Sequence, residues 1–243
     1  MDNHSLQRVA TRGNTCPNNP GLWALRDTRF GGLNHRYTGK HLKLLRTVDP
    51  FRASGVEFKS PLHLDNWLLR NFTPMVTECD TKCEGLKFIE GGKSRTVSAD
   101  LLTTFKDGIR VVDLVIPASR CAAPSEWYRL EQVAVAFGIV PALRTKEEIR
   151  SNPILLQNLD RWCQHGLVNM VIDLNFQDEV LKVVPAAGAM TVADILKELK
   201  ASRNPHVTQG HLDSALICLY RSGELRMNIA DASYGAETIV QSA

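Results

Sequence analysis

A short, almost uninterrupted run of apolar residues is the feature that most constrains the fold of this chain. The run Val111-Val-Asp-Leu-Val-Ile116 follows the turn sequence Lys106-Asp107-Gly108, and the segment Thr96–Phe105 before the turn also has the composition of a strand. This pattern is typical of a hairpin whose second strand is buried on both faces of a sheet. Because such a strand needs cover on both sides, we expect an α/β fold.

The segments around this hairpin supply the other elements. Ser60–Asn71 begins with an N-cap serine and a proline at the first helical position, and it carries apolar residues at helical spacing. A helix at Ser125–Phe137 precedes a strand at Ile139–Leu143, which we expect to run parallel to an inner strand because a helix intervenes. We also predict strands at Met75–Thr81 and Gly85–Ile89 and helices at Lys146–Ile149 and Pro153–Gln164.

The character of the chain changes after Gly166. An amphipathic helix follows Thr191, a second spans His211–Arg221 and ends at Gly223, and Glu224–Ile229 reads as a strand. Helix, turn, helix and strand is the order of a winged-helix module. We therefore predict an N-terminal arm (residues 1–34), an α/β domain (35–166) and a winged-helix domain (167–243).

Three motifs have the layout of a metal-dependent nuclease. Ser60-Pro-Leu-His63-Leu opens the first helix, Ser98-Ala-Asp100-Leu-Leu opens the hairpin, and Asp113 lies on the apolar strand. In restriction-endonuclease-like enzymes two carboxylates bind the divalent metal, and a lysine from a (D/E)-x-K strand positions or polarises the attacking water. Here the helix carries His63 instead of an acid, and the strand has no lysine.

The order of these motifs resembles TnsA, the endonuclease subunit of heteromeric cut-and-paste transposases. The matching segments are Ser60–Leu64, Ser98–Leu102 and Leu114–Ala118, and the resemblance extends over roughly residues 35–230. It implies a restriction-endonuclease-like mixed sheet flanked by helices, with DNA, a strand-transfer transposase and an ATPase regulator as partners. The family's glutamate corresponds to His63, and its lysine corresponds to Ile116 or, one residue earlier, to Val115.

These departures lead to three hypotheses. The first is a TnsA-like subunit that no longer cuts and acts in DNA binding or assembly. The second is an active endonuclease with a rearranged site, in which Asp100 and Asp113 hold Mg²⁺ or Mn²⁺ and His63 is part of the site. Glu57 is the nearby carboxylate that could then replace the missing acid, since Asp65 points away from the helix face of His63. The third is a transcription regulator that reads DNA with its winged helix.

Candidate DNA contacts come from two parts of the sequence. Lys93, Arg95, Lys106 and Arg110 lie around the predicted hairpins, and Gln209, His211 and Arg221 lie on the candidate recognition helix. The formal net charge of the 243 residues is only +3, so any DNA-binding face must arise from local clustering. In the C-terminal module acidic residues dilute the positive charge, which makes protein docking an equal alternative.

The cysteines and the hydropathy indicate the compartment. Cys79 and Cys83 could form half of a zinc site, but no second pair of Cys or His residues follows at finger-like spacing. We therefore expect free thiols in a reducing bacterial cytoplasm rather than a zinc site. The cysteines of the chain are Cys16, Cys79, Cys83, Cys121, Cys163 and Cys218. The first residues have no apolar core and do not resemble a signal peptide. No apolar run approaches the about 20 residues that a membrane span requires.

Overall fold

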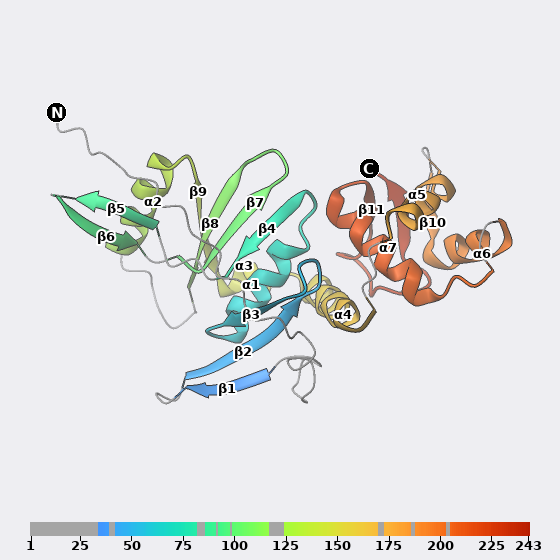
Figure 1. The fold of residues 1–243 in the computed structure, drawn as a ribbon, viewed down its shortest axis with the longest axis horizontal. Helices are drawn as coiled ribbons and strands as arrows, with labels where there is room; N and C mark the ends of the chain where they lie inside the picture. Colours follow the sequence, from blue (N-terminus) through green and yellow to red (C-terminus); the bar gives the residue numbers. More distant parts are fainter. Residues whose placement is uncertain are drawn as a thin grey trace.

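The computed structural model describes residues 34–38, 42–81, 86–90, 92–97, 99–116, 124–169, 173–185, 188–202 and 205–243. The predicted arm lies outside these ranges except for its last residue, and so do Cys83 and Ser98 of the sequence motifs. Within the described ranges the chain is a mixed α/β protein (Figure 1).

The first described elements form a small antiparallel sheet that leads directly into the first helix. Its strands are β1 (Asn34–Thr38), β2 (Leu42–Asp49) and β3 (Ser54–Phe58). Helix α1 (Pro61–Asn71) starts three residues after β3, with Ser60 at the N-cap position and Pro61 in the first turn, as predicted. The end of β3 and the start of α1 are therefore held close together by the chain itself.

The main sheet has four strands in the order β4-β7-β8-β9. These strands are β4 (Val76–Asp80), β7 (Leu101–Phe105), β8 (Arg110–Ile116) and β9 (Val140–Thr145). β8 is antiparallel to β7 and parallel to β9, and α2 (Pro124–Ala136) makes the crossover between β8 and β9. The predicted mixed sheet with a buried inner strand and a parallel neighbour is confirmed.

The predicted strand Thr96–Phe105 is wrong in one respect, because two strands share it. β6 (Lys93–Val97) pairs with β5 (Leu86–Glu90) in a separate two-stranded sheet, and only β7 joins the main sheet. This hairpin projects beyond α2 at the edge of the molecule (Figure 1). A strand composition cannot reveal this break, because both halves satisfy the same local pattern.

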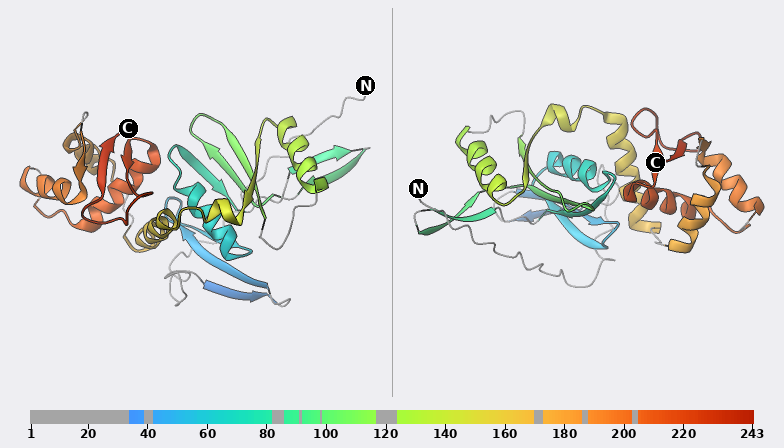
Figure 2. Two further views of the ribbon diagram at one scale, coloured as in Figure 1. Left: turned by 180° about the vertical axis from the view of Figure 1, so that it is seen from behind. Right: turned by 90° about the horizontal axis from the view of Figure 1, so that it is seen from above.

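Helices cover both faces of β8. Val112 shares a cluster with Leu130 and Val133 of α2, whereas Val115 packs with Leu62 of α1. Since positions separated by an odd number of residues point to opposite faces of a strand, α1 and α2 lie on opposite sides of the sheet. Figure 2 shows these elements from behind and from above.

The rest of the chain is largely helical. Its elements are α3 (Lys146–Ile149), α4 (Pro153–Asn169), α5 (Leu174–Val183), β10 (Met190–Thr191), α6 (Val192–Ser202), α7 (Gln209–Ser222), β11 (Leu225–Met227) and β12 (Ile239–Ser242). The three short strands form an antiparallel sheet in the order β10-β12-β11. Gly223 ends α7 in the left-handed conformation, with φ of 82°, as the sequence predicts.

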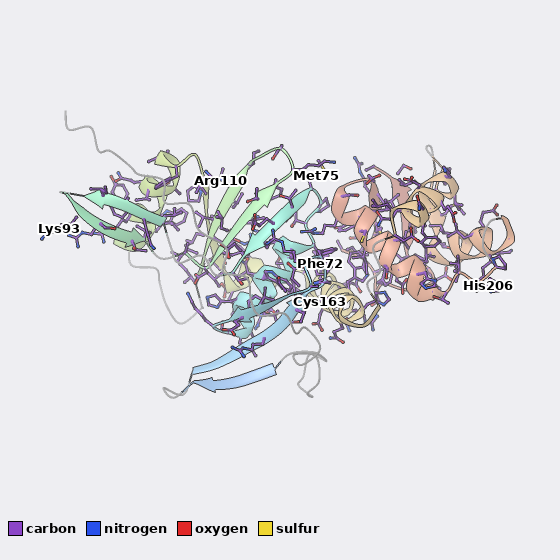
Figure 3. All side chains as sticks on the ribbon, in the orientation of Figure 1. Phe72, Met75, Lys93, Arg110, Cys163 and His206 are labelled. Atoms are coloured by element: carbon purple, nitrogen blue, oxygen red, sulfur yellow. The ribbon has the colours of Figure 1, made fainter. Side chains whose placement is uncertain are left out.

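Helix α7 belongs to two hydrophobic clusters. Leu216 packs with Ile195 in the C-terminal cluster, while Ile217 packs with Trp67 and Trp162 in the cluster that also contains Phe72 and Cys163, labelled in Figure 3. Val112 belongs to neither of these clusters. The proposed division after residue 166 falls within α4, which continues to Asn169, and α4 and α7 join the two parts.

Candidate functional site

One face of α1 carries the polar side chains that point to the main sheet. His63, Asn66 and Arg70 are spaced three and four residues apart, so they follow one another along the same side of the helix. Each of them contacts an aspartate of the β7–β8 region, Asp100 or Asp113. The helix and the hairpin therefore bring two of the predicted site carboxylates and His63 to one side of the sheet.

Asp113 is completely buried, and both of its carboxylate oxygens are paired. Arg70 donates from Nε to Oδ2 at 2.8 Å and from Nη2 to Oδ1 at 2.6 Å, and Asn66 Nδ2 donates to Oδ2 at 2.9 Å. Arg144 Nε of β9 donates in turn to Asn66 Oδ1 at 3.1 Å. A bidentate guanidinium–carboxylate pair of this kind fixes the helix against the strand. The role of Asp113 as a metal ligand or catalytic residue stays a prediction, and in this structure both of its carboxylate oxygens are hydrogen-bonded to Arg70 or Asn66.

Asp100 lies at the start of β7 and accepts three hydrogen bonds. Lys59 Nζ is 2.8 Å from Oδ1, His63 Nε2 is 3.3 Å from the same oxygen, and the Val115 N–H donates to Oδ2 at 2.9 Å. Burial by itself raises the pKa of Asp100, but the hydrogen bonds from His63, Lys59 and the Val115 amide outweigh it and lower the pKa to about 2. Asp100 is therefore ionised at every physiological pH.

A pocket of about 200 Å³ opens beside these groups. His63, Asp100, Lys59 and Val115 contribute to its wall, together with Glu57, which forms an ion pair with Arg46. The full lining is Glu57, Phe58, Lys59, His63, Asn66, Trp67, Thr81, Asp100, Leu101 and Val115. The indole N–H of the buried Trp67 has no hydrogen-bond partner within the described part of the chain.

The residues present do not fit a divalent metal. Nowhere in the described ranges do three or more His, Cys, Asp or Glu side chains gather closely enough to hold a metal ion. Asp65, the other acid of α1, is paired with Arg150 at 2.7 Å from Nε to Oδ2. The Asp100 carboxylate is already paired with Lys59 and His63, which take the place that a bound metal ion would have beside it.

The strand register decides which residue corresponds to the family's lysine. Val115 lies in the wall of the pocket and donates its N–H to Asp100, whereas Ile116 points to the other face of β8. If the resemblance holds, Val115 rather than Ile116 corresponds to the family's lysine. Sequence reasoning missed Lys59, because its proximity to Asp100 across 41 residues depends on tertiary packing.

The four cations predicted around the hairpins are not gathered into one cluster. Lys93 and Arg95 lie on β6 and are exposed, while Lys106 lies in the turn between β7 and β8. Lys93 and Arg110 are well separated in Figure 3. Arg110 Nη2 also donates to the carbonyl of Phe137 at 3.1 Å, so it contributes to the packing of α2 on the sheet.

The candidate contacts on α7 have different surroundings. Gln209 and His211 are exposed in the first turn, where Gln209 Nε2 donates to Asp213 Oδ1 at 2.7 Å. Arg221 is half-buried: its Nε donates to the Asn71 carbonyl at 2.8 Å, and its guanidinium lies 4.0 Å from the centre of the Phe51 ring. The DNA contact of Arg221 stays a prediction, and in this structure its guanidinium joins α7 to the end of α1.

Comparison with known proteins adds no family to this geometry. No protein-family model matches the chain, and no curated protein matches it. Among the helices of the described ranges, none is both long enough and apolar enough to span a bilayer.

Proposed function

We propose that this chain is a TnsA-like subunit of a DNA transposition complex that has lost metal-dependent cleavage and acts in DNA binding or assembly. The order α1-β4-β7-β8-α2-β9, interrupted after β4 by the β5–β6 hairpin, with β8 and β9 parallel, supports a restriction-endonuclease-like core. The resemblance of the three sequence motifs supports the transposition context, in which a strand-transfer transposase and an ATPase regulator are the partners.

The observation that carries the loss of cleavage is the internal pairing of both candidate carboxylates. Asp113 is held by Arg70 and Asn66, and Asp100 is held by Lys59 and His63. A Mg²⁺ ion prefers several oxygen ligands in near-octahedral geometry, which these neutralised groups do not supply. The geometry thus favours a domain that keeps the nuclease framework for binding or assembly.

The C-terminal part supports docking of a protein more than reading of DNA. Its order α5-β10-α6-α7-β11-β12, with β12 between the other two strands, supports the proposed winged helix, in which α7 would be the recognition helix. However, α7 packs on α4 through Ile217 and on the C-terminal cluster through Leu216, so it is covered on two sides. The regulator hypothesis needs this helix to enter a major groove, and it is therefore the less favoured one.

DNA contact is better supported at the β5–β6 hairpin. This two-stranded hairpin stands away from the main sheet, and its second strand carries the exposed Lys93 and Arg95. Cations on a projecting hairpin suit contact with the phosphate backbone, which gives affinity without sequence specificity.

The rearranged endonuclease remains a second candidate because of one observation. Lys59 Nζ lies 2.8 Å from Asp100, and Glu57 lines the same pocket, so a lysine and two acids are neighbours despite the altered motifs. Nicking by the unmodified chain would favour this candidate.

The first experiment measures nicking of supercoiled plasmid in Mg²⁺ and in Mn²⁺, with and without the transposase and ATPase of the same element. We expect no nicking by the chain alone, but retardation of duplex DNA that weakens with salt. Lys93→Glu with Arg95→Glu should weaken this retardation at least tenfold, while Lys146→Glu, an exposed change on α3, serves as the control. Nicking that disappears in Asp100→Ala would refute the proposed loss of cleavage.

The second experiment restores the missing motif. His63→Glu with Val115→Lys should gain Mn²⁺-dependent nicking over the parent, because the new carboxylate adds a metal ligand and the lysine can position the attacking water at the pocket. The matched control, His63→Glu with Ile116→Lys, places the lysine on the opposite face of β8 and should show a smaller gain. Equal gains in the two folded variants would contradict the assigned register.

A further inference from the structure

Ser60, His63 and Asp100 form a hydrogen-bonded relay whose chemistry differs from that of a metal-dependent nuclease. Ser60 Oγ is 2.7 Å from His63 Nδ1, and His63 Nε2 is 3.3 Å from Asp100 Oδ1. A hydroxyl, an imidazole and a carboxylate linked in this order are the components of an activated nucleophile. Neither the metal-nuclease framework nor a DNA-binding role requires this arrangement.

The carboxylate determines which imidazole nitrogen carries the proton. Asp100 is ionised and can only accept hydrogen bonds, so the imidazole must present an N–H at Nε2. In the neutral ring Nδ1 then has a free lone pair, and the Ser60 hydroxyl must donate to it. The hydroxyl proton therefore points to a base that is held in the correct tautomer to receive it.

The local structure leaves the Ser60 hydroxyl available for this bond. Ser60 occupies the N-cap position of α1, yet its side chain makes no capping hydrogen bond. By contrast, Thr145, Asp173 and Thr208 cap α3, α5 and α7 by accepting from a backbone N–H. Ser60 thus gives up the usual capping contact in favour of His63. The positive end of the α1 dipole also lies beside the hydroxyl, where it stabilises negative charge that develops during attack.

We propose that Ser60 is the nucleophile of an acyl-transfer site, with His63 as general base and Asp100 as the positioning residue, acting on carboxylic esters. Ser60 Oγ attacks the ester carbonyl and its proton passes to His63 Nδ1. The C–O bond to the alcohol then breaks, and the alcohol leaves with that proton. His63 then takes a proton from water, whose oxygen attacks the acyl carbonyl; the C–Oγ bond breaks, His63 returns the proton to Ser60 Oγ, and the acid is released. No oxidant, reductant or metal is needed for this balance.

His63 and Asp100 line a pocket of about 200 Å³, and the half-buried Ser60, which is outside that lining, directly follows Lys59 of its wall. The volume suits a small acyl group rather than a long chain. Trp67 also lines this pocket, but its indole N–H is buried and makes no hydrogen bond within the described part of the chain. Lys59, 65% exposed in its side chain, keeps Asp100 paired from the solvent side.

The test is covalent labelling of the full chain with an uncharged alkyl fluorophosphonate, followed by intact-mass and peptide mass spectrometry. Attack by Ser60 forms a P–Oγ bond and expels fluoride, and we expect one adduct that maps to Ser60. Ser60→Ala should abolish this adduct. Ser214→Ala is the matched control, because Ser214 Oγ lies 3.2 Å from His165 Nε2 in a second Ser–His pair, and it should leave the labelling unchanged.

The two supporting residues have separate readouts. Asp100→Asn would present an amide N–H to Nε2, reverse the tautomer and remove the base, so the limiting labelling rate should fall about 100-fold or more while the half-saturating probe concentration stays the same. His63→Phe should have a similar effect on the rate, with folding checked by circular dichroism.

The rate of p-nitrophenyl acetate hydrolysis should fall in Ser60→Ala, Asp100→Asn and His63→Phe. It should be unchanged in Ser214→Ala. Absence of a Ser60 adduct, or labelling that is as fast in Asp100→Asn and His63→Phe as in the parent, would overturn the proposal. Either result leaves the proposed DNA role untouched, since the assay contains no DNA.

Discussion

Replacing Arg70 with methionine should leave the Asp113 carboxylate buried without its cation. The side chain of Asp113 is 0% exposed, that of Arg70 is 18% exposed, and the change removes two charge-assisted hydrogen bonds while that from Asn66 remains. Removal of one partner from a buried ion pair costs about 3–5 kcal/mol. In a chain of this length that cost corresponds to a fall in Tm of about 10 °C.

Urea unfolding followed by tryptophan fluorescence is a suitable assay, because Trp67 and Trp162 lie in the cluster that α1 forms with the sheet. Arg52→Met is the matched control: its ion pair with Glu78 is 3.0 Å long, but both side chains are more than a third exposed, so we expect a loss of less than about 1 kcal/mol.

The double variant Arg70→Met with Asp113→Leu should recover most of the lost stability, since no charge is then buried unpaired. The reasoning is refuted if Arg70→Met costs no more than the Arg52 control, or if the double variant is less stable than Arg70→Met alone.

Three further predictions concern pH and backbone conformation. The pKa of Asp100 is lowered to about 2, so its stabilisation is complete above about pH 4 and is lost as the pH falls toward 2; Asp100→Asn should flatten this part of the Tm–pH curve. Burial raises the pKa of Asp160 to about 6, so stability falls as the pH rises from about 4 through 6, and Asp160→Asn should raise Tm at pH 8 but hardly at pH 4. Gly223→Ala should lower the stability by about 1–2 kcal/mol because of the positive φ, and further because the new Cβ would lie 2.7 Å from Met75 Sδ. Gly92→Ala is the control, because Gly92 also has a positive φ but has no atom near the new Cβ. The difference between the two variants in thermal melting then gives the cost of the contact with Met75.

Local signals in the sequence predicted much of the fold. The N-cap and proline before α1, the glycine turn before β8 and the left-handed glycine after α7 lie within a few residues of the structure that they specify. Such signals act through backbone conformation and periodicity, so they survive without tertiary information. They failed where a strand composition covered both β6 and β7, and α5 was not predicted.

The candidate site depended on contacts that no local signal contains. The sequence grouped His63 with Asp100 in one candidate site, and the structure places His63 Nε2 3.3 Å from Asp100 Oδ1. It did not indicate that Lys59 reaches Asp100, or that Arg70 occupies Asp113 across 43 residues. These pairs require a particular rotation of α1 and a particular register of β8, and packing sets both.

The sequence by itself determined most of the alternation of helices and strands and the buried inner strand. It also determined that no lysine follows Asp113 on that strand. Tertiary structure alone decided that Asp113 is neutralised, that α7 is covered by α4, and that Ser60, His63 and Asp100 align. The physical reason is that charge pairing and hydrogen-bond geometry depend on distances of about 3 Å between residues that are far apart in the chain, and only the packed fold fixes such distances.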